Sequence, residues 1–137
     1  MIISIDKNDN QKVFDNISDA HNCYKGISEK WIQRCIDKGI KYKGLHFIKV
    51  KSFSKLSIET ISEKENKTPL DVVIDANLSE TESKFIKKIQ IKSITKFIDN
   101  LLRYICQNKL KGNDVDTIIK HLANEKNYYK FIDKSYY

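Results

Sequence analysis

The segment from Ser28 to Lys38 constrains the fold of this chain more than any other. Its apolar residues recur at spacings of one and three or four, which is the pattern of a helix with one buried face. Gly26 precedes the segment, Gly39 follows it, and Ser28 offers a side-chain oxygen that can cap the first turn. The predicted inward residues are Trp31, Ile32, Cys35 and Ile36. Such a short helix is stable only when neighbouring elements cover its apolar face.

Short strand patterns flank this helix on both sides. Residues 2–5 alternate isoleucine with a small polar residue, residues 6–10 form a polar turn, and residues 12–14 resume an extended pattern. On the far side, residues 41–44 form a basic turn that leads into the alternating segment 45–50. The first 50 residues therefore predict a small sheet of about three strands.

A shorter helix is predicted between the hairpin and the segment 28–38. It starts at Ser18 and Asp19, since serine caps backbone N–H groups and an acidic residue favours the positive end of the helix dipole. Gly26 ends it. Its expected inward residues are Ala20 and either Cys23 or Tyr24. The two helices together form a strand-flanked helix-turn-helix module over residues 1–50.

A specific order of residues runs through the module. It comprises Val13-Phe14, Ile17-Ser18-Asp19-Ala20, Gly26-Ile27-Ser28, Ile32, Cys35, Lys38-Gly39, Tyr42-Lys43-Gly44 and Phe47. With this order, residues 2–50 resemble the nuclease-associated modular DNA-binding domain, which is found beside the catalytic domains of homing endonucleases and in phage proteins. The family has a second small residue and a leucine where this chain has residues 21–24. The resemblance implies a helix-turn-helix that lays its second helix on DNA, as an accessory to another activity.

The charge distribution agrees with a polyanionic partner. The net charge is +7, and residues 1–55 carry 11 Lys/Arg against 6 Asp/Glu, residues 56–83 carry 2 against 7, and residues 84–137 carry 12 against 5. If the second helix enters a major groove, Gln33 suits adenine and Arg34 suits guanine. The residues suited to phosphate oxygens are Ser28, Lys30, Lys41 and Lys43. The alternative interpretation is a solvated helix face, and a lone tryptophan such as Trp31 is more often core than contact.

The rest of the chain divides into a connector and a helical unit, so the predicted fold class is α+β. Residues 51–78 predict a connector with one strand or short helix, and residues 79–137 predict a helical packing or partner-binding unit. Residues 79–82 have the spacing of a capping box, from which a long helix runs to about Leu110. Its heptad stripe predicts a homodimer or a protein partner held by Ile91, Ile94, Ile98, Leu101 and Ile105.

The sequence predicts no catalytic residue, no metal site and no cofactor. Asp71 followed by Glu82-Ser83-Lys84 imitates a metal-dependent nuclease motif, but that chemistry needs the second element on a strand and the capping box predicts a helix. The Cys23/Cys35 and His21/His46 pairs lack the close spacing of zinc sites, and there is no glycine-rich phosphate loop. Three cysteines without framework spacing favour a reducing compartment, where Cys23, Cys35 and Cys106 act as small buried hydrophobes.

These features together predict a non-enzymatic, cytoplasmic protein that binds double-stranded DNA as an accessory or regulatory factor. Its Lys- and Asn-rich composition favours an AT-rich genome of a phage or mobile element. No run approaches the roughly 18 apolar residues of a membrane helix, and Asp6 places a charge too early for a signal peptide. The alternatives are a phage protein that binds a protein target through the same module, as an inhibitor of a host system or a virion component, and a nuclease fragment.

Overall fold

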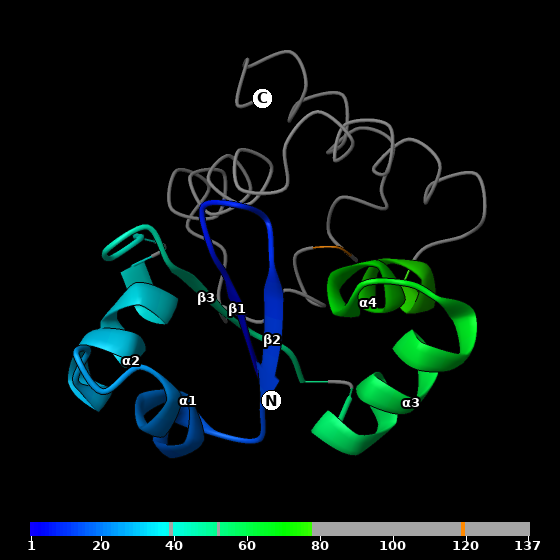
Figure 1. Ribbon diagram of the computed structural model, residues 1–137, viewed down its shortest axis with the longest axis horizontal. Helices are drawn as coiled ribbons and strands as arrows, with labels where there is room; N and C mark the ends of the chain where they lie inside the picture. Colours follow the sequence, from blue (N-terminus) through cyan, green and yellow to red (C-terminus); the bar gives the residue numbers. More distant parts are fainter. Residues whose placement is uncertain (39, 52, 78–118, 120–137) are drawn as a thin grey trace, which may run out of the picture.

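The computed structural model describes residues 1–38, 40–51, 53–77 and 119, and its helices lie on both faces of a central sheet (Figure 1). The sheet is antiparallel with the strand order β2-β1-β3. Its strands are β1 (Ile2–Ile5), β2 (Gln11–Phe14) and β3 (His46–Lys49). The helices are α1 (Ile17–Cys23), α2 (Glu29–Lys38), α3 (Lys55–Glu65) and α4 (Pro69–Asn77). The predicted α+β class, the hairpin and the third strand are confirmed.

The central strand β1 is buried on both of its faces. Ile2 pairs with Phe14 of β2 and Lys49 of β3, and Ile5 lies at the other end of the same ladders. Because successive side chains of a strand point to opposite faces, Ile2 and Ser4 face one layer of helices while the next residues face the other. All four residues of β1 are buried, so the sheet is the middle of three layers.

The α1–α2 layer covers one face of the sheet with an apolar core. This core comprises Ile2, Phe14, Ala20, Ile27, Ile32, Cys35, Ile36 and Phe47. The ring of Tyr24 packs edge-on against Phe14 and Phe47, with centroids 5.9 and 5.7 Å away. The hydroxyls of Tyr24 and Ser4 share a hydrogen bond of 2.9 Å. The buried hydroxyl of Ser4 in β1 therefore has a hydrogen-bond partner in Tyr24, the residue that follows α1.

The first helix begins earlier than the sequence predicts. Asn16, in an extended conformation, is its N-cap, and its side-chain oxygen accepts from the backbone N–H of Asp19 at 2.9 Å. Asparagine is as good an N-cap as serine. Because Asn16 is the cap, Ser18 lies inside the first turn of the helix rather than before it. At the second helix the prediction is confirmed, because the Trp31 backbone N–H donates to Ser28 Oγ at 3.2 Å.

Two helices form where the sequence indicated only a connector with one strand or short helix. Ser54 caps α3 through a capping box with Ser57, and Pro69 opens α4 at a position where a missing N–H costs nothing. The Leu70 backbone N–H donates to Gln11 Oε1 of β2 at 2.9 Å, which ties α4 to the sheet. The buried residues of this layer are Ile58, Leu70, Val72, Val73 and Ile74.

The cysteine prediction is half right within the described residues. Cys35 is buried in the α1–α2 core, and burial raises the pKa of its thiol. Cys23 is exposed at the end of α1, so it is not the buried hydrophobe that the sequence predicts. The next residue, Tyr24, which is the C-cap of α1, packs against the core instead. Cys106 lies outside the described residues.

The predicted helical unit over 79–137 lies outside the described residues, apart from Ile119, which is buried. The same holds for the stripe predicted to hold a partner, which is Ile91, Ile94, Ile98, Leu101 and Ile105. Among the helices that the structure describes, none combines the length and the apolar character needed to cross a bilayer.

Candidate nucleic-acid interface

The second helix turns a charged face away from the core. Lys30 and Arg34 lie near the middle of this face, one turn apart, and both are exposed. Helical spacing requires this arrangement, because Ile32, Cys35 and Ile36 occupy the opposite side. The two basic residues are therefore placed where a partner can reach them, as the sequence predicts.

Trp31 lies at the edge of α2 rather than in the core. Its side chain is 38% exposed, which corrects the prediction of a fully inward residue. Each residue of a helix advances about 100°, so Trp31 stands roughly a quarter turn from the buried stripe. Its ring instead stacks on Tyr42, with centroids 5.1 Å apart and planes inclined by 16°. The stack joins α2 to the turn that precedes β3.

Both stacked rings carry a cation. The guanidinium of Arg34 lies 5.1 Å from the centroid of the Trp31 ring, and the Nζ of Lys43 lies 5.5 Å from the centroid of the Tyr42 ring. Such contacts hold long basic side chains in defined positions at a modest gain in free energy. We call the four residues Trp31, Arg34, Tyr42 and Lys43 the aromatic ridge.

A tight turn presents the lysine of the ridge. Tyr42 and Leu45 exchange both backbone hydrogen bonds at 3.0 Å, and the two residues between them have positive φ, 51° at Lys43 and 78° at Gly44. Positive φ at both central residues is the geometry of a type I′ turn. Glycine adopts it without steric cost, whereas lysine adopts it less readily. The turn therefore places Lys43 at an exposed tip beside α2, and Lys41 is exposed just before it.

Gln33 and Ser28, both among the predicted contact residues, make hydrogen bonds to residues of α2. The Gln33 amide Nε2 donates to Asp37 Oδ1 at 2.8 Å, so pairing with adenine requires this bond to break. Ser28 Oγ accepts the Trp31 backbone N–H, yet its hydroxyl proton can still be donated to a phosphate. Of the six predicted residues, the structure brings Arg34 and Lys43 into one ridge and leaves Gln33 on another edge of the helix.

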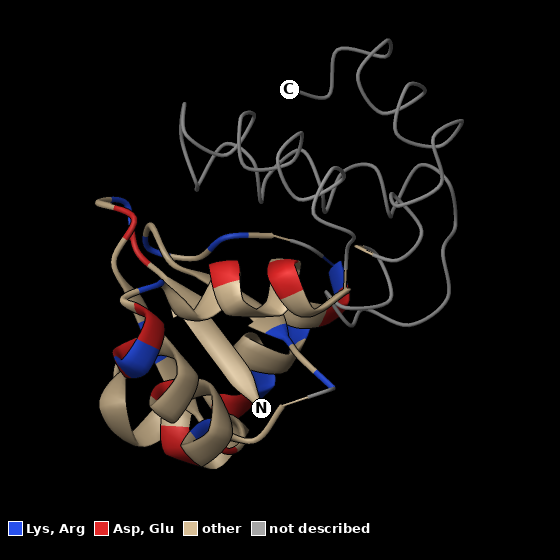
Figure 2. Ribbon diagram, turned by 90° about the vertical axis from the view of Figure 1, so that its right-hand side faces the viewer, with Lys and Arg blue, Asp and Glu red and all other residues tan. Residues whose placement is uncertain are grey.

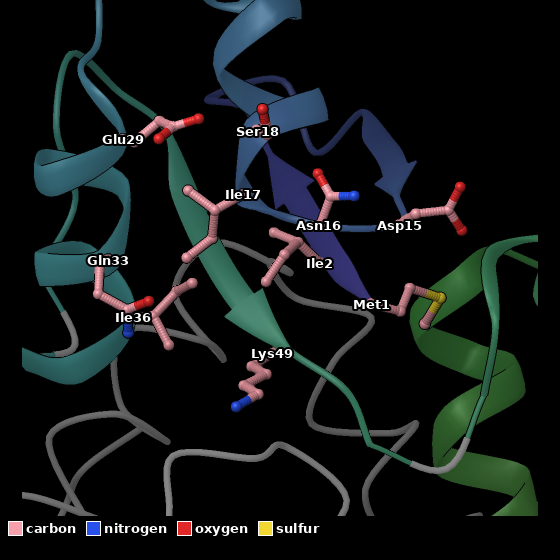
Figure 3. A pocket seen from close by; sticks show the side chains of 10 residues that line it. All are labelled: Met1, Ile2, Asp15, Asn16, Ile17, Ser18, Glu29, Gln33, Ile36 and Lys49. Carbon is pink, nitrogen blue, oxygen red and sulfur yellow. The ribbon is translucent and has the colours of Figure 1, made fainter.

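That other edge borders a cleft of about 420 Å³ (Figure 3). Its floor is apolar, where the side chains of Ile2, Ile17 and Ile36 point toward one another. Its rim carries the carboxylates of Asp15 and Glu29, with Lys49 at the far end. The remaining lining residues are Met1, Asn16, Ser18 and Gln33. The lining also includes Met1, whose N-terminal ammonium donates to the Val50 carbonyl at 3.3 Å, so this edge of α2 carries charges of both signs.

Metal chemistry finds no support within the part of the chain that the structure describes, where no three His, Cys, Asp or Glu side chains gather into a possible metal site. Nδ1 of His21 donates to the Ile27 carbonyl at 2.6 Å, which closes the turn between α1 and α2. His46 is buried on the opposite face of the sheet. Asp71 lies in the first turn of α4, and its predicted nuclease partners at 82–84 are outside the described residues.

No known protein family, no curated protein and no solved structure matches this chain. The resemblance of residues 2–50 to the nuclease-associated modular DNA-binding domain therefore stays a prediction. The geometry nonetheless adds to the site Trp31, which was predicted to face inward, and the Tyr42 ring, which sequence reasoning did not choose and which completes the ridge. The only signal for it was its place beside Lys43 and Gly44, in a turn rich in basic residues.

Proposed function

We propose that this protein binds double-stranded DNA without an enzymatic activity of its own, as an accessory or regulatory factor. The observation that carries the proposal is the aromatic ridge, which holds exposed cations from α2 and from the neighbouring turn on one surface. DNA presents phosphates on both sides of a groove, so a helix with basic side chains and an adjacent basic turn fits it. A cytoplasmic location and an origin in a phage or mobile element belong to the same proposal.

The dimensions of α2 suit a major groove. An α-helix with its side chains is about 10–12 Å across, which matches the groove width of about 12 Å, and the 10 residues of α2 give it a length of about 15 Å to lie along the groove. Arg34 is the residue best placed to read a base, because its planar guanidinium pairs with guanine through two hydrogen bonds. Lys30, Lys41 and Lys43 are suited to phosphate oxygens, which position a protein on DNA without reading its sequence.

Retention of the full chain on duplex DNA across a salt series tests the proposal. Affinity should fall steeply as salt rises, since each phosphate contact releases counterions. Arg34→Ala should weaken binding by about 1–3 kcal/mol and Lys43→Ala by less. Lys64→Ala is the matched control, because this exposed lysine lies on α3, across the sheet from the ridge. Absence of retention even in dilute buffer contradicts the proposal.

A second candidate function is binding to a protein target, as an inhibitor or a virion component. The observation that favours it is the exposed, stacked Trp31 beside Arg34, because tryptophan, tyrosine and arginine dominate the binding energy of protein interfaces. Under this alternative the chain shows no salt-dependent retention on DNA. Trp31→Ala then abolishes capture of the protein partner, whereas Lys64→Ala leaves it unchanged.

A further inference from the structure

We infer that the DNA-contacting surface extends beyond α2, across the turn at Tyr42–Leu45, to Lys7 in the turn between β1 and β2. The Trp31–Tyr42 stack is the joint that holds this extension against the helix. The partner is the sugar-phosphate backbone beside the groove that α2 enters. The inference rests on the proposed function and adds to it the turn between β1 and β2, with Lys7 as a residue that the sequence did not indicate.

The sheet topology brings the two turns together. Ile5, the last residue of β1, pairs with His46, the first residue of β3. The turn that leaves β1 and the turn that enters β3 therefore lie at the same end of the sheet (Figure 1). The two turns lie side by side, because a Cβ added at Gly44 would come within van der Waals distance, 3.8 Å, of the Cβ of Lys7. The side chains of Lys7 and Lys43 thus start from adjoining backbone.

The turn between the two helices adjoins this surface as well. The Nζ of Lys43 lies 3.7 Å from the position that a Cβ on Gly26 would occupy. Lys43 therefore reaches from the turn at 42–45 across to the turn that leads into α2, and it also contacts the Tyr42 ring. Ring and cation contacts run from α2 through Trp31 and Tyr42 to Lys43, and the next residue, Gly44, lies beside Lys7.

The carboxylate of Asp6, the residue before Lys7, has a structural role within its own turn. Asp6 Oδ1 accepts the backbone N–H groups of Asn8 at 2.8 Å and Asn10 at 3.0 Å, so this carboxylate shapes the turn. Asp9 adopts positive φ, 64°, and its backbone N–H donates to the Asp6 carbonyl at 3.0 Å. Lys7 and Lys43, one from each turn, are both exposed on this surface.

The slope of log affinity against log salt tests the extension, with the full chain and a duplex long enough to cover the whole surface. Each phosphate contact contributes about 0.9 to this slope, so Lys7→Ala and Lys43→Ala should each lower its magnitude by about 1. Lys64→Ala on α3 should leave the slope unchanged. A normal slope for Lys7→Ala, together with weakened binding by Arg34→Ala, overturns the extension and leaves the proposed function standing. No binding by the unaltered chain overturns the proposed function itself.

The joint is tested by a pair of substitutions at one position. Tyr42→Phe keeps the ring and should retain the salt slope, whereas Tyr42→Ala removes the stack and should lower the slope as Lys43→Ala does. Combining Tyr42→Ala with Lys43→Ala should then add little, because the two residues act through one contact. Urea unfolding of each variant checks that the fold persists. Equal slopes for the alanine variant and the unaltered chain exclude a positioning role for Tyr42.

Discussion

The two helical layers on either side of the sheet differ in what they expose. Residues 1–51, which include the α1–α2 layer, carry 10 Lys/Arg against 6 Asp/Glu, whereas residues 53–77 carry 3 against 5. Figure 2 views the molecule from the α3–α4 side and shows acidic segments on its helices. One layer thus exposes an excess of cations together with aromatic rings, and the other exposes an excess of acidic groups. One small sheet can carry a helical layer on each face, because its central strand β1 is buried on both faces.

The comparison also shows what each layer contributes to stability. The α1–α2 layer seals its face of the sheet with rings and a buried cysteine, while α4 seals the other with a continuous apolar run. Both cores are needed if the three layers unfold as one unit. If the two layers are equal partners in the fold, matched substitutions in them should lower the free energy of unfolding by similar amounts.

Truncating one core side chain in either layer should lower the free energy of unfolding by the same amount. Ile32→Ala in α2 and Ile74→Ala in α4 both remove a fully buried side chain, with an expected loss of about 2–5 kcal/mol in the free energy of unfolding. Urea denaturation of the full chain measures both. Leu56→Ala on α3 is the control, because this side chain is 76% exposed. A loss below about 1 kcal/mol for Ile74→Ala alone shows that α4 is an appendage to the fold.

Removing the side-chain acceptor that ties α4 to the sheet should have the next largest effect. Gln11→Met keeps the length of the side chain but leaves the Leu70 backbone N–H without its present acceptor, at an expected cost of about 1–3 kcal/mol. Thermal or urea unfolding measures the loss. Lys12→Met, at the exposed neighbouring position of β2, is the matched control. Equal stability of the two variants would show that the hydrogen bond from Leu70 to Gln11 does not stabilise the packing of α4 on the sheet.

The helix caps of the two layers should have similar and smaller effects. Asn16→Ala at α1 and Ser54→Ala at α3 each remove a side-chain acceptor for a backbone N–H, for a loss of about 1 kcal/mol. Asn16→Ser should restore most of the stability, since serine is also a good cap. Ser18→Ala distinguishes the observed cap from the predicted one, because Ser18 lies within α1. A larger loss for Ser18→Ala than for Asn16→Ala contradicts the structure.

The smallest effect should come from the ion pair at α4. Lys67 Nζ lies 2.7 Å from Asp75 Oδ2 and 3.3 Å from Glu65 Oε2, and these carboxylates, Asp75 foremost, raise the pKa of Lys67 above its usual value of 10.5. A raised folded-state pKa means that the stabilisation is full below the unfolded-state pKa and is lost as pH rises through the folded-state pKa. The stability difference between the unaltered chain and Lys67→Met should therefore stay constant from neutral to mildly alkaline pH and shrink in stronger alkali. High salt should shrink it as well, and Lys64→Met should show no such dependence.

The α1–α2 layer could be predicted because its signals are local. The helical spacing of Ile32, Cys35 and Ile36, with Ser28 as the cap, specifies α2 without reference to the rest of the chain. The surface positions of Lys30 and Arg34 follow from the same spacing. What the spacing could not supply is the stack on Trp31, since the partner ring arrives from a turn 11 residues further along the chain.

The α3–α4 layer escaped prediction for two physical reasons. Helix α3 buries only Ile58 fully. A helix that buries so little needs no continuous apolar stripe, and its sequence therefore gives no clear helical pattern. Helix α4 buries Leu70 and the run at 72–74 against the sheet, and a short continuous apolar run is equally typical of a buried strand. Both helices owe their stability to the sheet face that they cover, and the sequence pattern alone did not reveal that contact.

The position of β1 in the sheet sets the order in which this fold can assemble during synthesis. The central strand β1 leaves the ribosome before both of its partners, and one of them, β3, ends only at Lys49. The α1 and α2 segments emerge in between and must wait for the sheet on which they pack. A nascent chain that stops short of β3 therefore carries uncovered isoleucines, and we expect it to need protection from aggregation until the third strand arrives.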